Sequence, residues 1–196
     1  MKTLVIASGN PGKLREIGAI LAPLAIDVVP QSAFGVKEIE EPHLTFVENA
    51  IAKARHASRH TGLPALADDS GVCVDALGGA PGVHSARYAG YPRSDQRNNL
   101  KLIAALQGKA STRAHYYCVM VMVRQAGDPR PLIADGIWHG EITDSPRGAQ
   151  GFGYDPHFLL PDLGKTAAEL DPVLKNRVSH RGLALAALLE RLSAEG

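Results

Sequence analysis

The most informative stretch of the sequence is Pro64-Ala65-Leu66-Ala67-Asp68-Asp69-Ser70-Gly71-Val72-Cys73-Val74. Its apolar residues are typical of buried strand, and two adjacent carboxylates interrupt them. Charged side chains are almost never buried without a partner or a metal ion. We therefore expect the strand to break at Asp68 and Asp69, where a hard cation can be held against a rigid sheet. An ordinary turn is the alternative, because Asp, Ser and Gly are common turn residues.

The composition is that of a soluble globular chain. Its 196 residues are 45% hydrophobic, so we expect residues 1–196 to form a single domain with a sizeable core. The formal net charge of +1 argues against a nucleic-acid partner, which would favour a basic excess. The start of the chain does not resemble a signal peptide, and no apolar stretch is long enough to span a membrane. We predict a cytoplasmic protein with no membrane partner.

The two cysteines, Cys73 and Cys118, lie in apolar, strand-like runs. That context favours two reduced core thiols in a reducing compartment over a disulfide. No Cys-x-x-Cys or His/Cys cluster indicates structural zinc.

The hydrophobic periodicity predicts an α/β fold. Early in the chain, strands are expected at 3–7 and 26–29, with a helix between them that ends before Pro23. Thr45 and Glu48 form a capping box that opens another helix, on which Asn49 and Lys53 share one face.

Later segments add strands and two more helices. A helix is expected to begin at Ser94, with Leu100, Ile103 and Leu106 facing inward. Extended runs at 115–124 and 132–143, the second broken near Gly136 and Gly140, indicate a hairpin. An amphipathic helix is expected at 178–192. Alternation of helix and strand followed by hairpins favours a mixed sheet with flanking helices over a purely parallel one.

A phosphate-binding turn is the first candidate site. Ser8-Gly9-Asn10-Pro11-Gly12-Lys13 joins a predicted strand to a predicted helix. Exposed backbone N–H groups and the positive end of a helix dipole both favour phosphate, and Lys13 adds a full charge. A Walker A loop is excluded, because Ala7 stands where it needs glycine and Leu14 follows the lysine. A plain strand–helix turn is the alternative.

The acidic residues suggest a metal site. Glu40 and Glu41 lie in a connector, and they can converge with Asp68 and Asp69. Carboxylates from separate segments are the usual protein ligands of Mg²⁺, whose other ligands are waters and substrate phosphates. A further carboxylate can take a proton from water. For Glu40 and Glu41 a solvated charge run is the alternative.

A third set of residues lies near the carboxyl end. Phe152-Gly153-Tyr154-Asp155-Pro156 places two aromatic rings and an acid in a glycine-rich loop, which can stack on a base and accept from a base N–H. Lys175, His180 and Arg181 supply donors just before the last helix, and the last two can contact a carbonyl on a purine edge. Helix capping and surface charge are the alternative.

Together, in this order and spacing, the motifs resemble the inosine triphosphate pyrophosphatase family, in its bacterial dITP/XTP pyrophosphatase branch. The resemblance covers the whole chain, and His84 is a small departure, because this branch commonly has tyrosine there. The matching stretches are Ser8-Gly9-Asn10 with Lys13, Thr45-Phe46 and Glu48-Asn49-Ala50 with Lys53, Ala67-Asp68-Asp69-Ser70-Gly71, Leu77-Gly78-Gly79-Ala80-Pro81-Gly82-Val83 with Ser85-Ala86-Arg87-Tyr88-Ala89-Gly90, Gly151-Phe152-Gly153-Tyr154-Asp155-Pro156, and Lys175-Asn176 with Ser179-His180-Arg181-Gly182.

The resemblance implies an activity and an architecture. It implies hydrolysis of the purine nucleoside triphosphates ITP, dITP and XTP to the monophosphate and pyrophosphate, which removes deaminated purines before they enter DNA or RNA. It also implies a Mg²⁺ cofactor, a homodimer, and a central cleft between two lobes on a long mixed sheet. A phosphohydrolase for other modified triphosphates and a non-catalytic nucleotide-binding module are the alternatives.

The resemblance also assigns roles. Ser8, Gly9, Asn10, Pro11, Gly12 and Lys13 would hold the triphosphate, and Ser70 would hydrogen-bond the substrate. Glu40 and Asp69 would hold Mg²⁺, with Asp69 as general base. Asp68, Asn49 and Lys53 would support that cluster. The nucleoside pocket would consist of Phe152, Gly153, Tyr154, Asp155, Lys175, His180 and Arg181.

Overall fold

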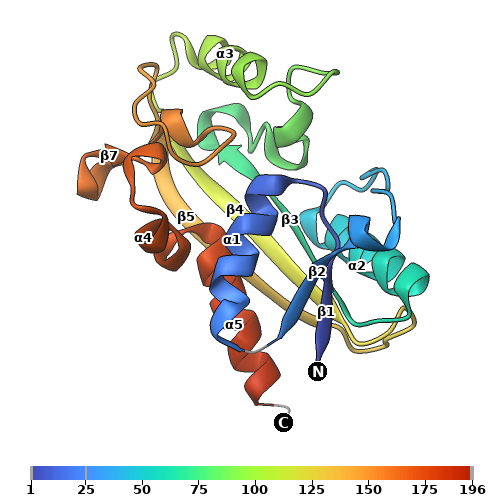
Figure 1. The fold of residues 1–196 in the computed structure, drawn as a ribbon. Coiled ribbons are helices and arrows are strands. Elements are labelled where there is room, and N and C mark those ends of the chain that lie inside the picture. The colour runs from blue at the N-terminus through green and yellow to red at the C-terminus, as the bar shows by residue number, and fades with distance from the viewer. Residues whose placement is uncertain (1, 25, 195–196) are drawn as a thin grey trace. The chain divides into compact units, whose positions relative to one another are not determined.

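A mixed β-sheet organises the fold, shown as a computed structural model in Figure 1. Within residues 2–24 and 26–194, which the structure describes, seven strands form one sheet in the order β2-β1-β3-β4-β5-β6-β7. β1 is parallel to β2 and β3, whereas β6 is antiparallel to β5 and β7. The predicted α/β class with a mixed sheet and flanking helices is confirmed.

The main elements follow the predicted order. The strands are β1 (Thr3–Ile6), β2 (Asp27–Pro30), β3 (Ala65–Val74), β4 (Arg113–Val123), β5 (Leu132–Ile142), β6 (Phe158–Leu160) and β7 (Lys165–Thr166). The helices are α1 (Pro11–Leu21), α2 (Phe46–Thr61), α3 (Asp95–Leu106), α4 (Pro172–Val178) and α5 (His180–Ser193). The predicted carboxy-terminal helix is therefore preceded by a separate short helix, and the two are divided at Ser179.

The chain divides into two compact units. The first unit comprises Met1–Asp69, Cys118–Gly136 and Arg181–Gly196. The second unit comprises Ser70–Tyr117 and Ile137–His180.

The core of the first unit joins α1 and α5 to the sheet. Ile17 and Leu21 of α1 are buried with Leu185 and Leu188 of α5, against apolar strand residues such as Met120. α1 begins where the sequence predicts, because Asn10 caps its amino end and a proline occupies its first position.

The core of the second unit lies beneath α3. Leu102 and Leu106 of this helix are buried with the rings of Trp138 and Phe158. The sequence prediction for the inward face of α3 is partly wrong, because Leu100 is 62% exposed. Two asparagines, Asn98 and Asn99, share the buried face instead. Because both residues are polar, the pattern of apolar residues in the sequence does not indicate that they lie on the buried face of α3.

Two strands that the sequence predicts to be broken are continuous. β3 runs through Asp68 and Asp69 without interruption, because both carboxylates have cationic partners. β5 likewise runs through Gly136 and Gly140. A Cβ atom at Gly140 would lie 2.5 Å from the Leu159 carbonyl oxygen and 2.7 Å from the Phe158 ring. This glycine therefore permits a close approach of β6 and does not end the strand.

Both cysteines are free, as predicted. Cys118 is fully buried, whereas Cys73 is only half-buried, so one of the two is a true core thiol. Burial first, and then the neighbouring Asp68, raise the pKa of the Cys118 thiol.

The close approach at Gly140 predicts a measurable loss of stability. Replacement by alanine should lower the free energy of unfolding in urea by about 1–3 kcal/mol, because the added methyl group has no space. The matched control is Gly127→Ala, since a Cβ atom there meets nothing within 4 Å. Equal stability of the two variants would contradict the tight packing of β6 on β5.

Candidate active site

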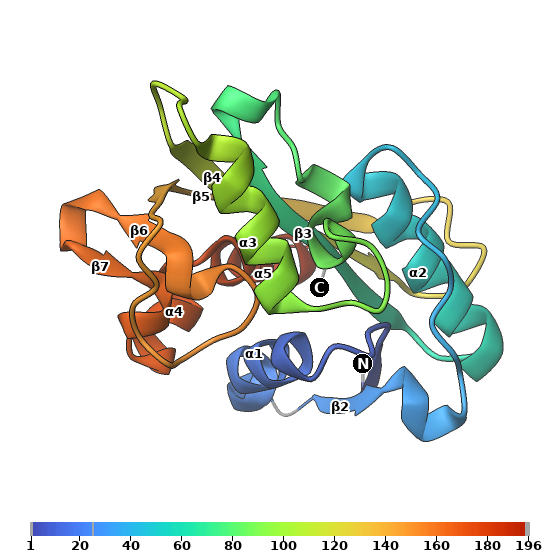
Figure 2. The ribbon, with the colours of Figure 1, turned by 90° about the horizontal axis from the view of Figure 1, so that it is seen from above.

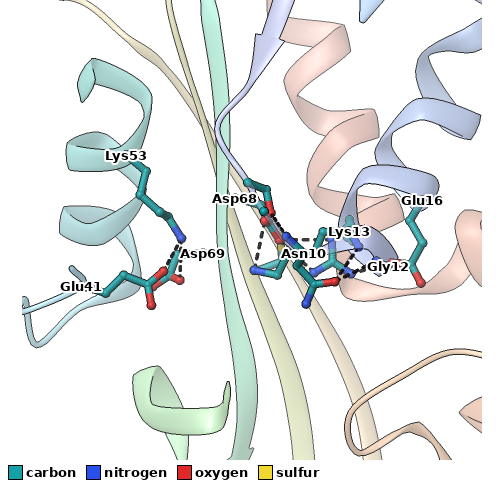
Figure 3. A network of polar contacts seen from close by, with 12 residues as sticks. Asn10, Gly12, Lys13, Glu16, Glu41, Lys53, Asp68 and Asp69 are labelled. Atoms are coloured by element: carbon teal, nitrogen blue, oxygen red, sulfur yellow. Dashed lines mark hydrogen bonds and ion pairs between the residues drawn. The ribbon is translucent and has the colours of Figure 1, made fainter. Parts of the chain in front are cut away.

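Asp68 and Asp69 point to opposite sides of β3, as Figure 3 shows. Successive side chains of a strand alternate between its faces, so two adjacent carboxylates are presented to two different environments. Both residues are buried, with 1% and 5% of their surface exposed. Each carboxylate must therefore be compensated on its own side of the strand.

Arg181 and Lys13 compensate Asp68. The Oδ2 atom of Asp68 accepts from Nε of Arg181 at 3.1 Å and from its Nη2 at 2.8 Å, and Oδ1 lies 3.0 Å from Nζ of Lys13. Glu16 completes the network by accepting from Nη1 of Arg181 at 2.5 Å. Lys13 and Glu16 are three residues apart on α1, so they share one face of that helix.

The charges of this network stabilise one another. Burial alone would raise the pKa of Asp68, but Lys13 and Arg181 hold it well below its usual range. Burial alone would lower the pKa of Arg181, and Asp68 raises it instead. Removal of one member of such a buried ion pair costs about 3–5 kcal/mol. Arg181 thus has a structural partner that the sequence did not reveal, whereas the predicted role was a contact with the base.

Lys53 bridges two carboxylates on the other side of β3. Its Nζ donates to Oδ1 of Asp69 at 3.0 Å and to Oε1 of Glu41 at 2.7 Å. Burial would lower the pKa of Lys53, but Asp69 and then Glu41 raise it, so the ammonium group stays charged. The predicted proximity of Lys53 to the acidic cluster is present in the structure.

The second carboxylate oxygen of Asp69 differs from the one that Lys53 holds. Its Oδ2 atom is buried and has no hydrogen bond among the described residues. Burial raises the pKa of Asp69, and the attraction of Lys53 offsets this only in part. Asp69 is therefore a carboxylate of increased basicity, with one oxygen oriented by Lys53 and the other buried without a hydrogen bond from the described residues.

The connector before α2 brings Glu41 to this cluster. The sequence prediction pairs Glu40 with Asp69, but Glu40 is exposed and the half-buried Glu41 contacts Lys53. Two adjacent acids in an irregular segment are equivalent in sequence, and only the path of the backbone decides which one turns inward.

Asn49 determines part of that path. Its Oδ1 accepts from the N–H of His43 at 3.1 Å, and its Nδ2 donates to the carbonyl of the same residue at 3.2 Å. The side chain is 1% exposed. The sequence predicts that Asn49 faces the acidic cluster, whereas its amide holds the connector two residues beyond Glu41.

The turn before α1 is held by its own side chains. Asn10 accepts from the N–H groups of Gly12 at 2.8 Å and Lys13 at 3.2 Å, and the buried Ser8 accepts from the N–H of Asn10 at 3.1 Å. The N–H of Gly9 donates to a carboxylate oxygen of Glu38 at 2.8 Å. This last bond shows that Gly9 can bind an anionic oxygen, and Glu38 was not predicted.

In the second unit, Asp155 organises the glycine-rich loop. Its Oδ2 accepts from Nζ of Lys175 at 2.6 Å and from the N–H of Phe152 at 2.9 Å, while Oδ1 accepts from the hydroxyl of Tyr116 at 3.1 Å. A Cβ atom at Gly151 would lie 2.0 Å from Oδ2, which explains the glycine. Asp155 is 2% exposed, and its carboxylate oxygens accept hydrogen bonds from within the protein.

The aromatic residues of the predicted nucleoside pocket separate into two groups. Tyr154 is buried and donates its hydroxyl proton to the carbonyl of Ser85 at 2.8 Å, so it is not a stacking surface. His180 is buried with its ring stacked 4.5 Å from that of Tyr116. Phe152 is only half-buried, and Nζ of Lys175 lies 5.3 Å from its ring centroid.

Three further residues of the predicted site, Pro11, Gly153 and Ser70, are placed by the backbone of their elements. Pro11 is exposed at the first position of α1, and Gly153 adopts a left-handed backbone with a φ of 64°. Ser70 is half-buried in β3 and follows Asp69 directly.

The residues around Asp69 fit a magnesium ion. In the described ranges, 2–24 and 26–194, no group of three His, Cys, Asp or Glu side chains is arranged to hold a metal. Mg²⁺ does not need such a group, because it binds through one or two carboxylates together with waters and substrate phosphates. The Oδ2 atom of Asp69, which has no hydrogen bond among the described residues, and the nearby carboxylate of Glu41 would provide that chemistry.

The bonds of Asn49 predict a local effect. Asn49→Ala should free the connector and speed tryptic cleavage after Lys37, because both polar groups of His43 lose their partner. Asn98 is a matched control, since it binds the carbonyl of Ala86 and the N–H of Ala89 in the same way. Asn98→Ala should speed cleavage after Arg87 instead. Identical cleavage patterns in the two variants would refute a local role for Asn49.

Comparisons with known proteins place the chain in a family. The family model described as the Ham1 family matches residues 4–191. A dITP/XTP pyrophosphatase of Ralstonia nicotianae is 65% identical over 98% of this chain and 97% of that protein. A protein of the same name from Nitrosomonas europaea is also 65% identical, over 98% of this chain and 95% of its own length.

Solved structures agree with these sequence matches. The structure of a HAM1 protein from Coxiella burnetii has a TM-score of 0.91 and 49% identity, covering 99% of this chain and 100% of that one. The Staphylococcus aureus Ham1 protein has a TM-score of 0.87 and 39% identity, with 100% of both chains covered. With a fold, a set of motifs and full-length relatives in agreement, the chain belongs to the Ham1 family.

Proposed function

We propose that the protein hydrolyses non-standard purine nucleoside triphosphates, ITP, dITP and XTP, to the monophosphate and pyrophosphate. The observation that carries the proposal is the basic, partly unsatisfied carboxylate of Asp69, set beside Lys53 in a rigid strand. The names of the full-length relatives, dITP/XTP pyrophosphatase, support the same reaction. Such an enzyme clears deaminated purines from the nucleotide pool.

The triphosphate is assigned to the turn before α1. Gly9 already donates to an anionic oxygen there, and a phosphate oxygen can replace the carboxylate of the exposed Glu38. Lys13 lies at the start of α1 with its ammonium group against Asp68, so its position is fixed before substrate binds. We propose that its charge stabilises the pyrophosphate as it leaves.

Asp69 is the proposed general base. Lys53 holds Oδ1, and Oδ2 is free to accept a proton from a water molecule that attacks the α-phosphorus. Burial raises the pKa of Asp69, which strengthens the carboxylate as a base. Lys53 in turn keeps the carboxylate from rotating, so Oδ2 stays directed at the reacting water.

Asp69 and Glu41 would hold the Mg²⁺ ion. When bound, this ion makes a coordinated water more acidic and neutralises phosphate charge. Asn49 contributes indirectly, because it fixes the connector that carries Glu41. Glu40, the ligand predicted from the sequence, is exposed, and this position favours it less than Glu41 as a metal ligand.

The base is assigned to the second unit. Hypoxanthine and xanthine present an acceptor at the 6-position and a donor at N1, and adenine presents the reverse. Phe152 offers a partly exposed ring for stacking, with Lys175 and His180 as nearby candidates for donors to the 6-oxo group. Buried polar groups left unpaired by adenine can reject it by roughly 10⁴-fold.

The alternatives differ in what they require. A non-catalytic nucleotide-binding module has no need for a buried carboxylate with an open oxygen, so Asp69 argues against it. A phosphohydrolase for other modified triphosphates would retain Asp69 and differ in the loop at Phe152. A panel of triphosphates with different bases separates that alternative from the proposal.

Assembly and location stay predictions. No helix among the described residues combines the length and apolar character needed to cross a membrane. The homodimer and the cytoplasmic compartment come from the family resemblance and the sequence. Light scattering on the purified protein tests the first of these.

The proposed reaction predicts defined products. With Mg²⁺ present, ITP should yield IMP and pyrophosphate, and ATP should react far more slowly. Asp69→Asn should lower kcat by several orders of magnitude with the fold retained, because the amide cannot accept the proton from water. Coupled assays for pyrophosphate and for single phosphate distinguish the products. Release of single phosphate with IDP left behind would contradict the proposal.

The proposed ligands predict a difference between two adjacent acids. Glu41→Gln should weaken Mn²⁺ binding, measured directly by electron paramagnetic resonance with Mn²⁺ as the probe, because a carboxylate beside Asp69 is lost. Glu40→Gln removes the same charge from an exposed neighbour and should leave the Mn²⁺ affinity unchanged. Weaker Mn²⁺ binding only in the Glu40 variant would show that Glu40, and not Glu41, is the metal ligand.

A further inference from the structure

α3 holds the glycine-rich loop from a second direction. The N–H of Gly153 donates to Oδ2 of Asp95 at 2.8 Å, and its carbonyl accepts from Nδ2 of Asn99 at 3.0 Å. Asp95 and Asn99 are four residues apart and lie on one face of α3. Figure 2 shows this helix beside the loop that leads into β6. One residue of the loop is therefore clamped at both of its backbone polar groups.

Asn99 is unusual for a residue on the buried face of a helix. It is 9% exposed, and its Oδ1 atom is buried with no hydrogen-bond partner among the described residues. A buried polar side chain with an unsatisfied acceptor disfavours folding, and an apolar residue would avoid this penalty. Asn99 does, however, donate a hydrogen bond to the carbonyl of Gly153, which an apolar residue could not do.

The bond from Asp95 acts on a peptide plane next to Phe152, and the bond from Asn99 acts on the following plane, after Gly153. Asp155 accepts from the N–H of Phe152, which holds the plane before it. Asp95 accepts from the N–H of Gly153, which holds the plane after it, and the N–H of Asp155 donates to the Phe152 carbonyl in that same plane at 3.3 Å. With both planes held, the direction in which the Phe152 side chain leaves the backbone is determined.

Gly153 makes this arrangement sensitive to the clamp. Its φ of 64° lies in the left-handed region, and glycine has broad freedom on both sides of that value. Without the bonds from α3, the long bond from the N–H of Asp155 to the Phe152 carbonyl would be left to restrain the loop at Gly153. The clamp from α3 removes that freedom.

We propose that Asp95 and Asn99 are positioning residues for base recognition. They hold Gly153 so that the Phe152 ring lies where a purine base stacks, and neither residue needs to touch the reacting phosphates. The inference rests on the proposed function, because it assigns a role within the binding of the nucleoside. It separates the recognition of the base, through α3, from the chemistry at Asp69.

The experiment compares ITP with tripolyphosphate, an inhibitor that has the phosphate groups but no nucleoside. Asn99→Ala should raise KM for ITP by about two- to tenfold, as loss of one positioning hydrogen bond predicts, with kcat changed less than KM. The inhibition constant of tripolyphosphate should stay unchanged. A variant that is merely less well folded would lose affinity for both compounds.

Further variants keep the test decisive if Asn99→Ala folds poorly. Asn99→Asp keeps the shape but replaces the donor facing the Gly153 carbonyl, so it should also raise KM. Asp95 is exposed, so Asp95→Ala should fold and raise KM, whereas Asp95→Asn retains an acceptor and should restore it. Gln96→Ala changes an exposed neighbour on α3 and serves as the matched control.

Two results would overturn the inference. One is an unchanged KM for ITP in every Asn99 and Asp95 variant while the wild-type protein is active. The other is a parallel rise in KM and in the inhibition constant of tripolyphosphate. If the wild-type protein released no pyrophosphate from ITP at all, the proposed function would fall and this inference with it.

Discussion

The structure depends on the compensation of two adjacent carboxylates inside a buried strand. Asp68 and Asp69 face opposite sides of β3, so one pair of partners cannot serve both. Lys13 and Arg181 meet Asp68, and Lys53 meets Asp69. These cations come from α1, α5 and α2, so the charges also hold three helices of the first unit in place. Each helix also packs through buried apolar residues.

This constraint links stability to the proposed chemistry. Both oxygens of Asp68 face cations, Oδ2 through hydrogen bonds from Arg181 and Oδ1 through the ion pair with Lys13, and these cations lower its pKa. Within the described part of the chain, Asp69 is paired at one oxygen only, and burial raises its pKa. The different surroundings of two neighbouring residues thus separate the structural role of Asp68 from the chemical role proposed for Asp69, whose Oδ1 is held by Lys53.

Local features could be predicted from the sequence, and distant contacts could not. The start of α1 follows from Asn10 and Pro11, which lie next to the helix they cap. The break expected in β3 was wrong because the partner of Asp68 is Arg181, far away in the chain. The choice between Glu40 and Glu41 likewise depends on a backbone path that Asn49 holds. The spacing of Lys13 and Glu16 on α1 was a signal that could have revealed the network around Asp68.

The proposed reaction requires water to attack the α-phosphorus of a purine nucleoside triphosphate. Hydrolysis of ITP in water enriched in ¹⁸O, followed by mass spectrometry of both products, tests it most directly. The account predicts that the label enters the phosphate group of IMP and that pyrophosphate remains unlabelled. Label in pyrophosphate or in single phosphate, with none in IMP, would place the attack at another phosphorus atom and contradict the account.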